Sequence, residues 1–288
     1  MNDAHCHFFS TPFFAALGGD AALAKLGWEA PGTAEALADR WLAELDRHRV
    51  GRAALIASMP GDAPSVAAAV ARRRDRFVGF FMIDPTQPDA EVAAAAALAG
   101  GALRAVCLFP AMHRYAIQDA RVQRVFDVAA ARPGTAVFVH CGVLSVGVRR
   151  KLGLPSPFDI RFGNPLDLHA VALRNPQVPI IIPHFGAGLL REALMVADLC
   201  PNVHFDTSSS NGWIKYVPGL TLNAVFSQAL AVLGPERLLF GTDSSFFPRG
   251  WVADIYEQQR RALNELGVSS LVQDEIFVKN FDRLFPLS

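Results

Sequence analysis

Apolar and polar positions along the chain alternate between two patterns. Short runs rich in β-branched and aromatic residues are followed by longer segments rich in Ala, Leu and Arg with helical spacing, which is typical of repeated βα units. Eight segments have the strand pattern: Asp3–His7, Arg52–Ala57, Phe77–Ile83, Ala102–Leu108, Ala136–His140, Pro179–Pro183, Val203–Asp206 and Arg237–Gly241. The pattern therefore predicts eight parallel strands joined by helices.

The intervening segments are predicted to be helical. Thr33–Arg47 begins with a suitable N-cap, and Ala90–Leu98 is rich in the strongest helix former. The other predicted helices are Val122–Ala131, Leu166–Leu173, Leu189–Leu199, Thr221–Leu233, Val252–Leu266 and a terminal Val272–Leu284. We therefore expect residues 1–288 to form a single α/β domain, a closed (β/α)8 TIM barrel with a C-terminal helix. An open doubly wound sheet is the alternative, but no strand is followed by a glycine-rich nucleotide-binding motif.

Polar residues at the ends of four predicted strands indicate where a site lies. In a barrel of this kind, the site is built at the C-terminal ends of the strands. His5 and His7 alternate with Cys6, so the two imidazoles project from the same face of the first strand. The strand-end residues are His5 and His7 on the first strand, His140 on the fifth, His184 on the sixth and Asp243 on the eighth. We expect them to share a metal site, because buried His and Asp clusters usually pair with one another or with a cation.

Each of these residues also has a structural interpretation. A single buried histidine is more often satisfied by a backbone partner, and Asp243 alone could cap a helix or a turn. The coincidence on four strands favours the metal site. Surface or structural positions are expected for the other four histidines, which are His48, His113, His169 and His204.

The combined motifs resemble the amidohydrolase superfamily, in its amidohydrolase-related branch. The motifs are D-x-H-x-H on the first strand, V-F-V-H on the fifth, P-H-F-G on the sixth and G-T-D at the eighth, and the segment KNFDRLFPL resembles the end of these chains. The resemblance covers the whole chain. It implies that one divalent metal is held by His5, His7, His140 and Asp243, and that His184 is a neighbour that handles protons.

The predicted ligand set indicates which metal to expect. Three imidazoles and a carboxylate suit Zn²⁺, and Mn²⁺ also accepts nitrogen and oxygen ligands. Many members with two metals carry a carboxylated lysine on the fourth strand, but here that strand reads RAVCLFP. We therefore expect a single metal ion, most readily Zn²⁺, with Mn²⁺ as the alternative.

Loop residues give weaker indications of the substrate. Phe8 follows the first strand, and Trp213 and Tyr216 follow the seventh, so these rings could line a pocket or pack beneath the loops. Arg249 lies a few residues after Asp243 and is the best candidate for holding a substrate carboxylate. Arg149–Lys151 are expected to be solvated surface charges.

The resemblance leaves three functions open. Hydrolysis of a carboxylated or cyclic lactone or amide ranks first, because it is the commoner chemistry in the superfamily and the chain looks short for the branch's decarboxylases. In that reaction Asp243 accepts a proton from metal-activated water, and His184 stabilises or protonates the departing group. Non-oxidative decarboxylation of an aromatic or unsaturated acid is the alternative, and a non-catalytic metal-binding barrel ranks third.

The composition limits the possible binding partners and the cellular location of the protein. Lys+Arg and Asp+Glu both total 27, so no net charge favours nucleic acid or an anionic membrane. No apolar run approaches the roughly 20 residues of a membrane span, the start lacks a signal-peptide pattern, and the four cysteines form no C-x-x-C pair. We expect a cytoplasmic protein with a small-molecule substrate; homo-oligomer formation stays open.

Overall fold

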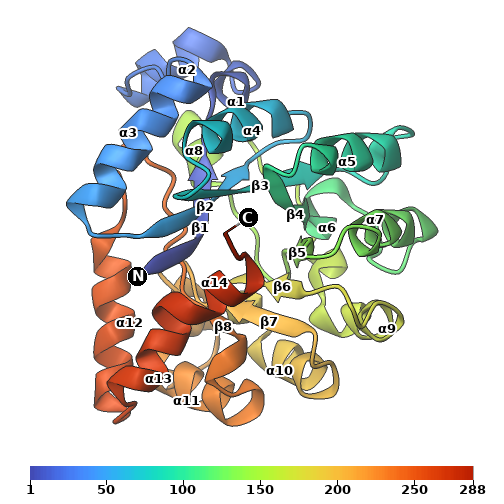
Figure 1. The fold of residues 1–288 in the computed structure, drawn as a ribbon, viewed down its shortest axis with the longest axis vertical. Helices are drawn as coiled ribbons and strands as arrows, with labels where there is room; N and C mark the ends of the chain where they lie inside the picture. Colours follow the sequence, from blue (N-terminus) through green and yellow to red (C-terminus); the bar gives the residue numbers. More distant parts are fainter. Residues whose placement is uncertain (288) are drawn as a thin grey trace.

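Eight parallel strands lie side by side in chain order in the computed structural model, which describes residues 1–287 (Figure 1). They are β1 (Asn2–Phe8), β2 (Arg52–Ala57), β3 (Phe77–Ile83), β4 (Leu103–Leu108), β5 (Ala136–Val139), β6 (Ile180–Ile182), β7 (Val203–Asp206) and β8 (Leu238–Leu239). The sheet curls until its two edges meet, because the Ala4 amide donates to Phe240 O at 2.8 Å and the His7 amide to Ser244 O at 2.7 Å. The predicted TIM barrel is confirmed.

Helices surround the barrel (Figure 1). They are α1 (Thr11–Ala15), α2 (Gly19–Leu26), α3 (Ala34–Arg47), α4 (Ala63–Arg72), α5 (Ala90–Ala99), α6 (Pro110–His113), α7 (Ala120–Ala130), α8 (Gly147–Leu152), α9 (His169–Arg174), α10 (Leu190–Leu199), α11 (Leu222–Leu233), α12 (Ala253–Glu265), α13 (Ser270–Asp274) and α14 (Asn280–Leu284). Among the described residues, no helix has the length and apolar character needed to cross a membrane.

Two predicted helices differ from those observed. The segment Leu166–Leu173 is a 3₁₀ turn followed by α9, because Pro165 opens the turn and the Asn164 side chain caps it through the Leu166 amide. The segment Val272–Leu284 is interrupted between α13 and α14 by a π-helical turn, Glu275–Lys279. There the carbonyl of Ile276 accepts a hydrogen bond from the Phe240 amide just beyond β8, so the turn is tied to the barrel.

The C-terminal helix closes one end of the barrel. Phe281 of α14 and Phe285, which directly follows this helix, are buried against interior side chains such as Ala4, Phe80 and Phe138. Figure 1 shows α14 lying across this end of the barrel. The side-chain amide of Asn280 anchors this helix, because its Nδ2 donates to Pro235 O at 2.7 Å and to Leu238 O at 2.8 Å. The barrel is therefore plugged at its N-terminal end, which leaves the C-terminal ends of the strands for a site.

We expect Asn280→Ala to lower the free energy of unfolding by about 1–3 kcal/mol, because it leaves two inward carbonyls without this donor. Unfolding in urea measures the loss. The matched control is Asn223→Ala, which removes an exposed hydrogen bond to Glu265 and should change stability by no more than about 0.5 kcal/mol. Equal losses in the two variants would contradict the anchoring role.

A bulge in β1 determines which of its side chains face the barrel interior. Asp3 pairs with Ala53, but Cys6 pairs with Leu55, so β1 has one extra residue between these positions. His5, within the bulge, and His7, beyond it, both point toward the cavity at the strand ends, whereas Cys6 packs in the core between strands and helices. The paired histidines predicted from the alternation therefore lie on the same face.

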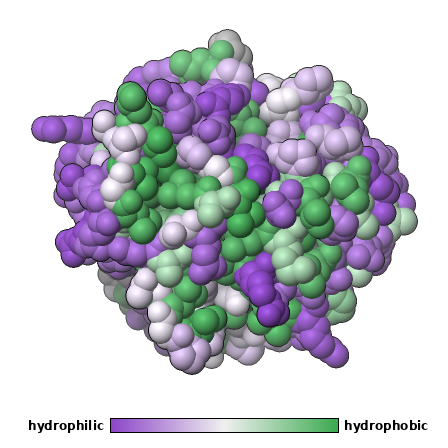
Figure 2. All heavy atoms as spheres, turned by 90° about the horizontal axis from the view of Figure 1, so that it is seen from below, coloured by the Kyte–Doolittle hydropathy of each residue, from purple (hydrophilic) through white to green (hydrophobic). Residues whose placement is uncertain are grey.

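The outer surface of the helices carries scattered apolar groups. Figure 2 shows, from below, apolar areas lying between polar ones. Exposed apolar side chains on the helices include Met195, Leu199 and Leu271. Single exposed apolar residues are ordinary for a folded protein.

Candidate metal centre

The structure brings the strand-end residues together around one cavity of about 760 Å³ at the C-terminal ends of the strands. The five residues that line its floor are His5, His7, His140, His184 and Asp243. They come from β1 and from the segments that directly follow β5, β6 and β8. The topology thus brings residues from four separate segments of the sequence into one cluster.

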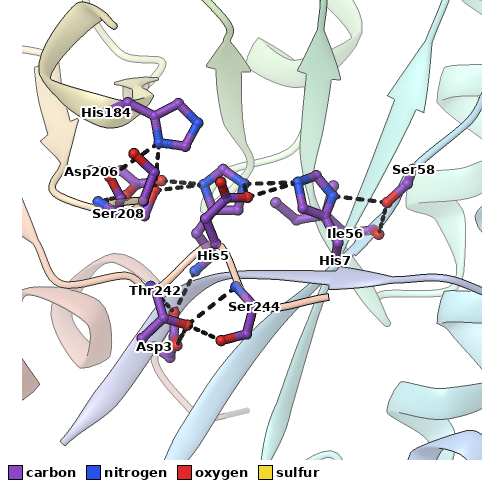
Figure 3. A network of polar contacts seen from close by, with 12 residues as sticks. Asp3, His5, His7, Ile56, Ser58, His184, Asp206, Ser208, Thr242 and Ser244 are labelled. Carbon is purple, nitrogen blue, oxygen red and sulfur yellow. Dashed lines mark hydrogen bonds and ion pairs between the residues drawn. The ribbon is translucent and has the colours of Figure 1, made fainter. Parts of the chain in front are cut away.

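Hydrogen bonds at Nδ1 of His5 and of His7 show which nitrogen of each ring carries the proton. The Ser58 hydroxyl donates to Ile56 O at 3.1 Å, so it accepts from His7 Nδ1, which lies 2.8 Å away. His5 Nδ1 lies 2.6 Å from a carboxylate oxygen of Asp206, which can only accept, so Nδ1 donates this hydrogen bond. Both Nδ1 atoms therefore carry protons, and the Nε2 atoms are the ones available as ligands (Figure 3).

The two Nε2 atoms converge with the carboxylate of Asp243. His5 Nε2 and His7 Nε2 lie 3.3 Å apart, at 3.6 and 3.1 Å from Asp243 Oδ1. Burial raises the pKa of Asp243, but the neighbouring His7, His5 and His184 outweigh it and hold that pKa below its usual range. Three electron-pair donors at this spacing fit a divalent cation, which attracts all three at once.

His140 supplies an independent test of that fit. It is buried, and its Nδ1 atom has no hydrogen-bond partner within residues 1–287. Burial lowers the pKa of His140 well below its usual value, so its ring is neutral. An unpaired buried nitrogen costs free energy, so a metal ion bound in the cavity that His140 lines would lower that cost if it took His140 as a ligand.

His184 lies beside the same cluster in a strained backbone conformation. Its φ is +56°, and that of Asp243 is +61°, in the left-handed region that non-glycine residues seldom adopt. One donor atom each from His5, His184 and Asp243 lies within 4.8 Å of the others. Burial lowers the pKa of His184, which favours the neutral ring. His184 is therefore within reach of a shared ion and of a proton on a bound substrate.

The cavity walls include most of the predicted substrate-binding residues. Trp213, Tyr216 and Arg249 line the cavity. Phe8 does not, and this expectation is wrong: its ring is fully buried in the core outside the barrel, because the alternation that directs His7 inward directs Phe8 outward. Phe9 and Phe13 line the cavity instead, with ring centroids 4.1 Å apart.

Aromatic and cationic side chains make up much of the wall. Arg150 and Lys151 are exposed, as expected, but they also reach the cavity mouth, because α8 lies in the long segment after β5. The lining cations are Arg150, Lys151, Lys215 and Arg249, and the lining aromatic residues are Phe9, Phe13, Trp28, Phe109, Trp213, Tyr216 and Phe247. In the part of the chain that the structure describes, Asp243 is the one acidic residue of the lining. The mouth therefore favours an anionic ligand.

Three site residues are absent from the sequence-based prediction. Asp206 and Ser208 contact His5 from β7 and its following loop, and Ser58 contacts His7 from the segment after β2. Asp206 ends a predicted strand just as His140 does, so the rule that identified the other strand-end residues also applies to it. Ser58 and Ser208 carry no comparable signal, because serine is common in loops.

A sequence model of the amidohydrolase family matches residues 3–287. No protein of curated function matches the chain.

Solved structures show the same fold at low sequence identity. A probable 2-pyrone-4,6-dicarboxylic acid hydrolase from Acinetobacter baumannii, with citric acid bound, is 16% identical with a TM-score of 0.62, and 99% of each chain is covered. A 5-carboxyvanillate decarboxylase from Novosphingobium aromaticivorans, complexed with manganese and 4-hydroxy-3-methoxy-5-nitrobenzoic acid, is 15% identical (TM-score 0.61; 99% of this chain and 96% of that chain). An amidohydrolase from Burkholderia multivorans with bound zinc is 16% identical (TM-score 0.64; 99% of each chain).

Proposed function

The chain belongs to the amidohydrolase family, and we propose that it is a metal-dependent hydrolase of a small cyclic ester or amide that carries a carboxylate. The observation that carries this proposal is the convergence of His5 Nε2, His7 Nε2 and Asp243 Oδ1 on the floor of a cavity with a cationic mouth. A lactone or amide carbonyl would lie at this floor, and the carboxylate of the substrate would face the cations.

We assign the metal to one ion held by His5, His7, His140 and Asp243. Zn²⁺ suits three imidazoles and a carboxylate best, and Mn²⁺ is the second choice. A single ion is favoured because Cys107 and Leu108 of β4 stand where a bridging lysine would be needed. When bound, such an ion polarises a carbonyl and makes water more acidic.

The residues of the chain would then handle the protons. Asp243 accepts a proton from the attacking water as its oxygen bonds to the carbonyl carbon. His184 relays that proton to the oxygen or nitrogen that departs when the ring bond breaks. Hydrolysis begins by removing a proton from water, which requires an acceptor, and ionised Asp243 and neutral His184 are both acceptors. This is the physical reason for ranking hydrolysis first.

Non-oxidative decarboxylation of an aromatic acid is the second candidate. The observation that favours it is the aromatic wall, in which the stacked rings of Phe9 and Phe13 would suit a planar ring. Chain length is no argument against it, because the comparison covers 96% of the decarboxylase chain from Novosphingobium aromaticivorans. In this reaction a proton donor must reach the carbon that loses carbon dioxide, and His184 would have to be protonated first.

A panel of substrates distinguishes the two reactions. The metal-loaded protein is incubated with carboxylated lactones and cyclic amides, and separately with hydroxylated aromatic acids. Hydrolysis predicts ring opening with one new carboxyl group per turnover and no gas. Release of carbon dioxide from the aromatic acids, with no ring opening in the other set, would replace the first proposal by the second.

We expect Arg249→Ala to raise KM for a carboxylated substrate by about 10- to 100-fold, because a charge-assisted hydrogen bond is worth about 1.5–3 kcal/mol. The effect should vanish with the methyl ester of the same substrate. Arg74→Ala is the matched control, since Arg74 is exposed and does not line the cavity. An equal rise in KM for acid and ester would contradict the proposed contact.

The proposal also includes the cellular location of the protein and its binding partners. The four cysteines are free and buried, which suits a reducing compartment, and we therefore keep a cytoplasmic location. A small-molecule substrate remains the proposed partner, without nucleic acid or membrane. Association of copies into a homo-oligomer is left to measurement by light scattering.

A further inference from the structure

The end of β7 and the loop that follows it form a buried polar unit behind the metal centre. Asp206 and Ser208 are fully buried. One carboxylate oxygen of Asp206 lies 2.6 Å from His5 Nδ1, and the other accepts a hydrogen bond from the Ser208 amide at 2.7 Å. Both oxygens therefore accept hydrogen bonds, and the Nδ1–H group of His5 is the ring donor that faces the negative charge of Asp206.

Ser208 contacts two histidine rings at once. Its hydroxyl oxygen lies 3.0 Å from His5 Nδ1 and 2.9 Å from His184 Nδ1. Its carbonyl oxygen, which can only accept, lies 3.2 Å from the same nitrogen of His184. The three side chains and their contacts are visible together in Figure 3.

Close packing against the segment that follows β8 holds this unit in place. A Cβ atom at Gly241 would lie 2.9 Å from Asp206 Oδ1, 2.9 Å from Ser208 Cβ and 3.0 Å from His5 Cβ. The backbone of Gly241 therefore fits directly against all three residues, and little room remains for His5 or Asp206 to turn away.

We propose that Asp206 and Ser208 are positioning residues, which keep a proton on Nδ1 of His5 and of His184 so that both Nε2 atoms present electron pairs to the metal centre. This inference rests on the proposed metal site. The hydrogen bond at one imidazole nitrogen determines whether the other is free to bind a metal or accept a proton. The carboxylate of Asp206 keeps the proton on Nδ1 of His5, and the carbonyl of Ser208 keeps it on Nδ1 of His184. The Ser208 hydroxyl contacts both rings.

The first test is metal affinity. Asp206→Asn is expected to bind Zn²⁺ about 10- to 100-fold more weakly than the wild type in competition with a chelator, the usual cost of losing the hydrogen-bond partner of a ligand. Asp84→Asn is the matched control: Asp84 follows β3, its carboxylate accepts hydrogen bonds from Thr86 and Gln87, and it does not line the cavity. Its affinity should equal that of the wild type. A folded Asp206→Asn protein with unchanged affinity would overturn the role of Asp206.

The second test reads the proton positions directly and requires no change at Asp206. Protein labelled with ¹⁵N in histidine is studied by NMR in its metal-free form, at a pH above the titration of both rings. His5 and His184 are identified by the signals that disappear in His5→Gln and His184→Gln. The expected spectrum shows the proton on Nδ1 in both rings, and a proton on Nε2 of either ring would overturn the proposal for that ring.

Ser208→Ala tests the link between the rings. The variant loses the hydroxyl but keeps the Ser208 carbonyl, which can only accept from His184 Nδ1, so the proton should stay on Nδ1 while the ¹⁵N signals of His5 and His184 shift. Unshifted signals from both rings would remove the hydroxyl of Ser208 from the proposal. Failure of the metal site itself gives a different result: the wild type would bind no divalent ion, while the spectrum of the metal-free protein would still report where the protons lie.

Discussion

His7→Ala and His140→Ala are each expected to purify without the divalent ion, while Arg150→Ala retains it. Either histidine change removes a proposed ligand, which should cost more than the 10- to 100-fold in affinity that is lost with a hydrogen-bond partner of a ligand. Metal content per chain after dialysis, measured by elemental analysis, gives the result. Arg150 is a suitable control because it lies at the cavity mouth rather than at the floor. Full occupancy in both histidine variants would refute the ligand assignment.

His184→Asn should keep most of the metal and the fold, while turnover falls by about 100-fold or more, the usual scale for a lost general acid or base. The asparagine occupies a similar volume but cannot relay a proton. Metal content and turnover are measured on the same preparation. The control is His169→Asn, because His169 opens α9 and does not line the cavity.

The outcome for His184 separates three roles. Turnover lost with metal retained identifies a proton-handling residue. Parallel loss of metal and turnover would make His184 a ligand, which its distance from His5 and Asp243 permits. Loss of neither would reduce it to a structural residue at the end of β6.

The barrel and its strand-end residues could be predicted because both follow from local patterns. Alternation along β1 places His5 and His7 on one face, and the topology of a parallel barrel brings the ends of all strands to one rim. His140, His184 and Asp243 needed no further information to be grouped with them. Asp206 obeys the same rule, and it could have been included on the pattern alone.

Other features depend on contacts between distant segments and could not be read from the pattern. The bulge at β1 appears only in the pairing with β2. Arg150 reaches the cavity because α8 forms within a long segment that has no clear periodicity. The outward direction of Phe8, in contrast, follows from the alternation of β1 and could have been predicted. The π-helical turn before α14 makes a hydrogen bond from the Phe240 amide to the Ile276 carbonyl, which joins residues that lie far apart in the sequence.

The central claim is that one divalent ion lies where His5, His7, His140 and Asp243 converge, and a crystal grown with Zn²⁺ tests it most directly. Anomalous diffraction at the zinc edge should reveal a single strong peak per chain, bounded by the Nε2 atoms of His5 and His7 and by the carboxylate of Asp243. Two strong peaks in the cavity, or a single peak away from these atoms, would contradict the account.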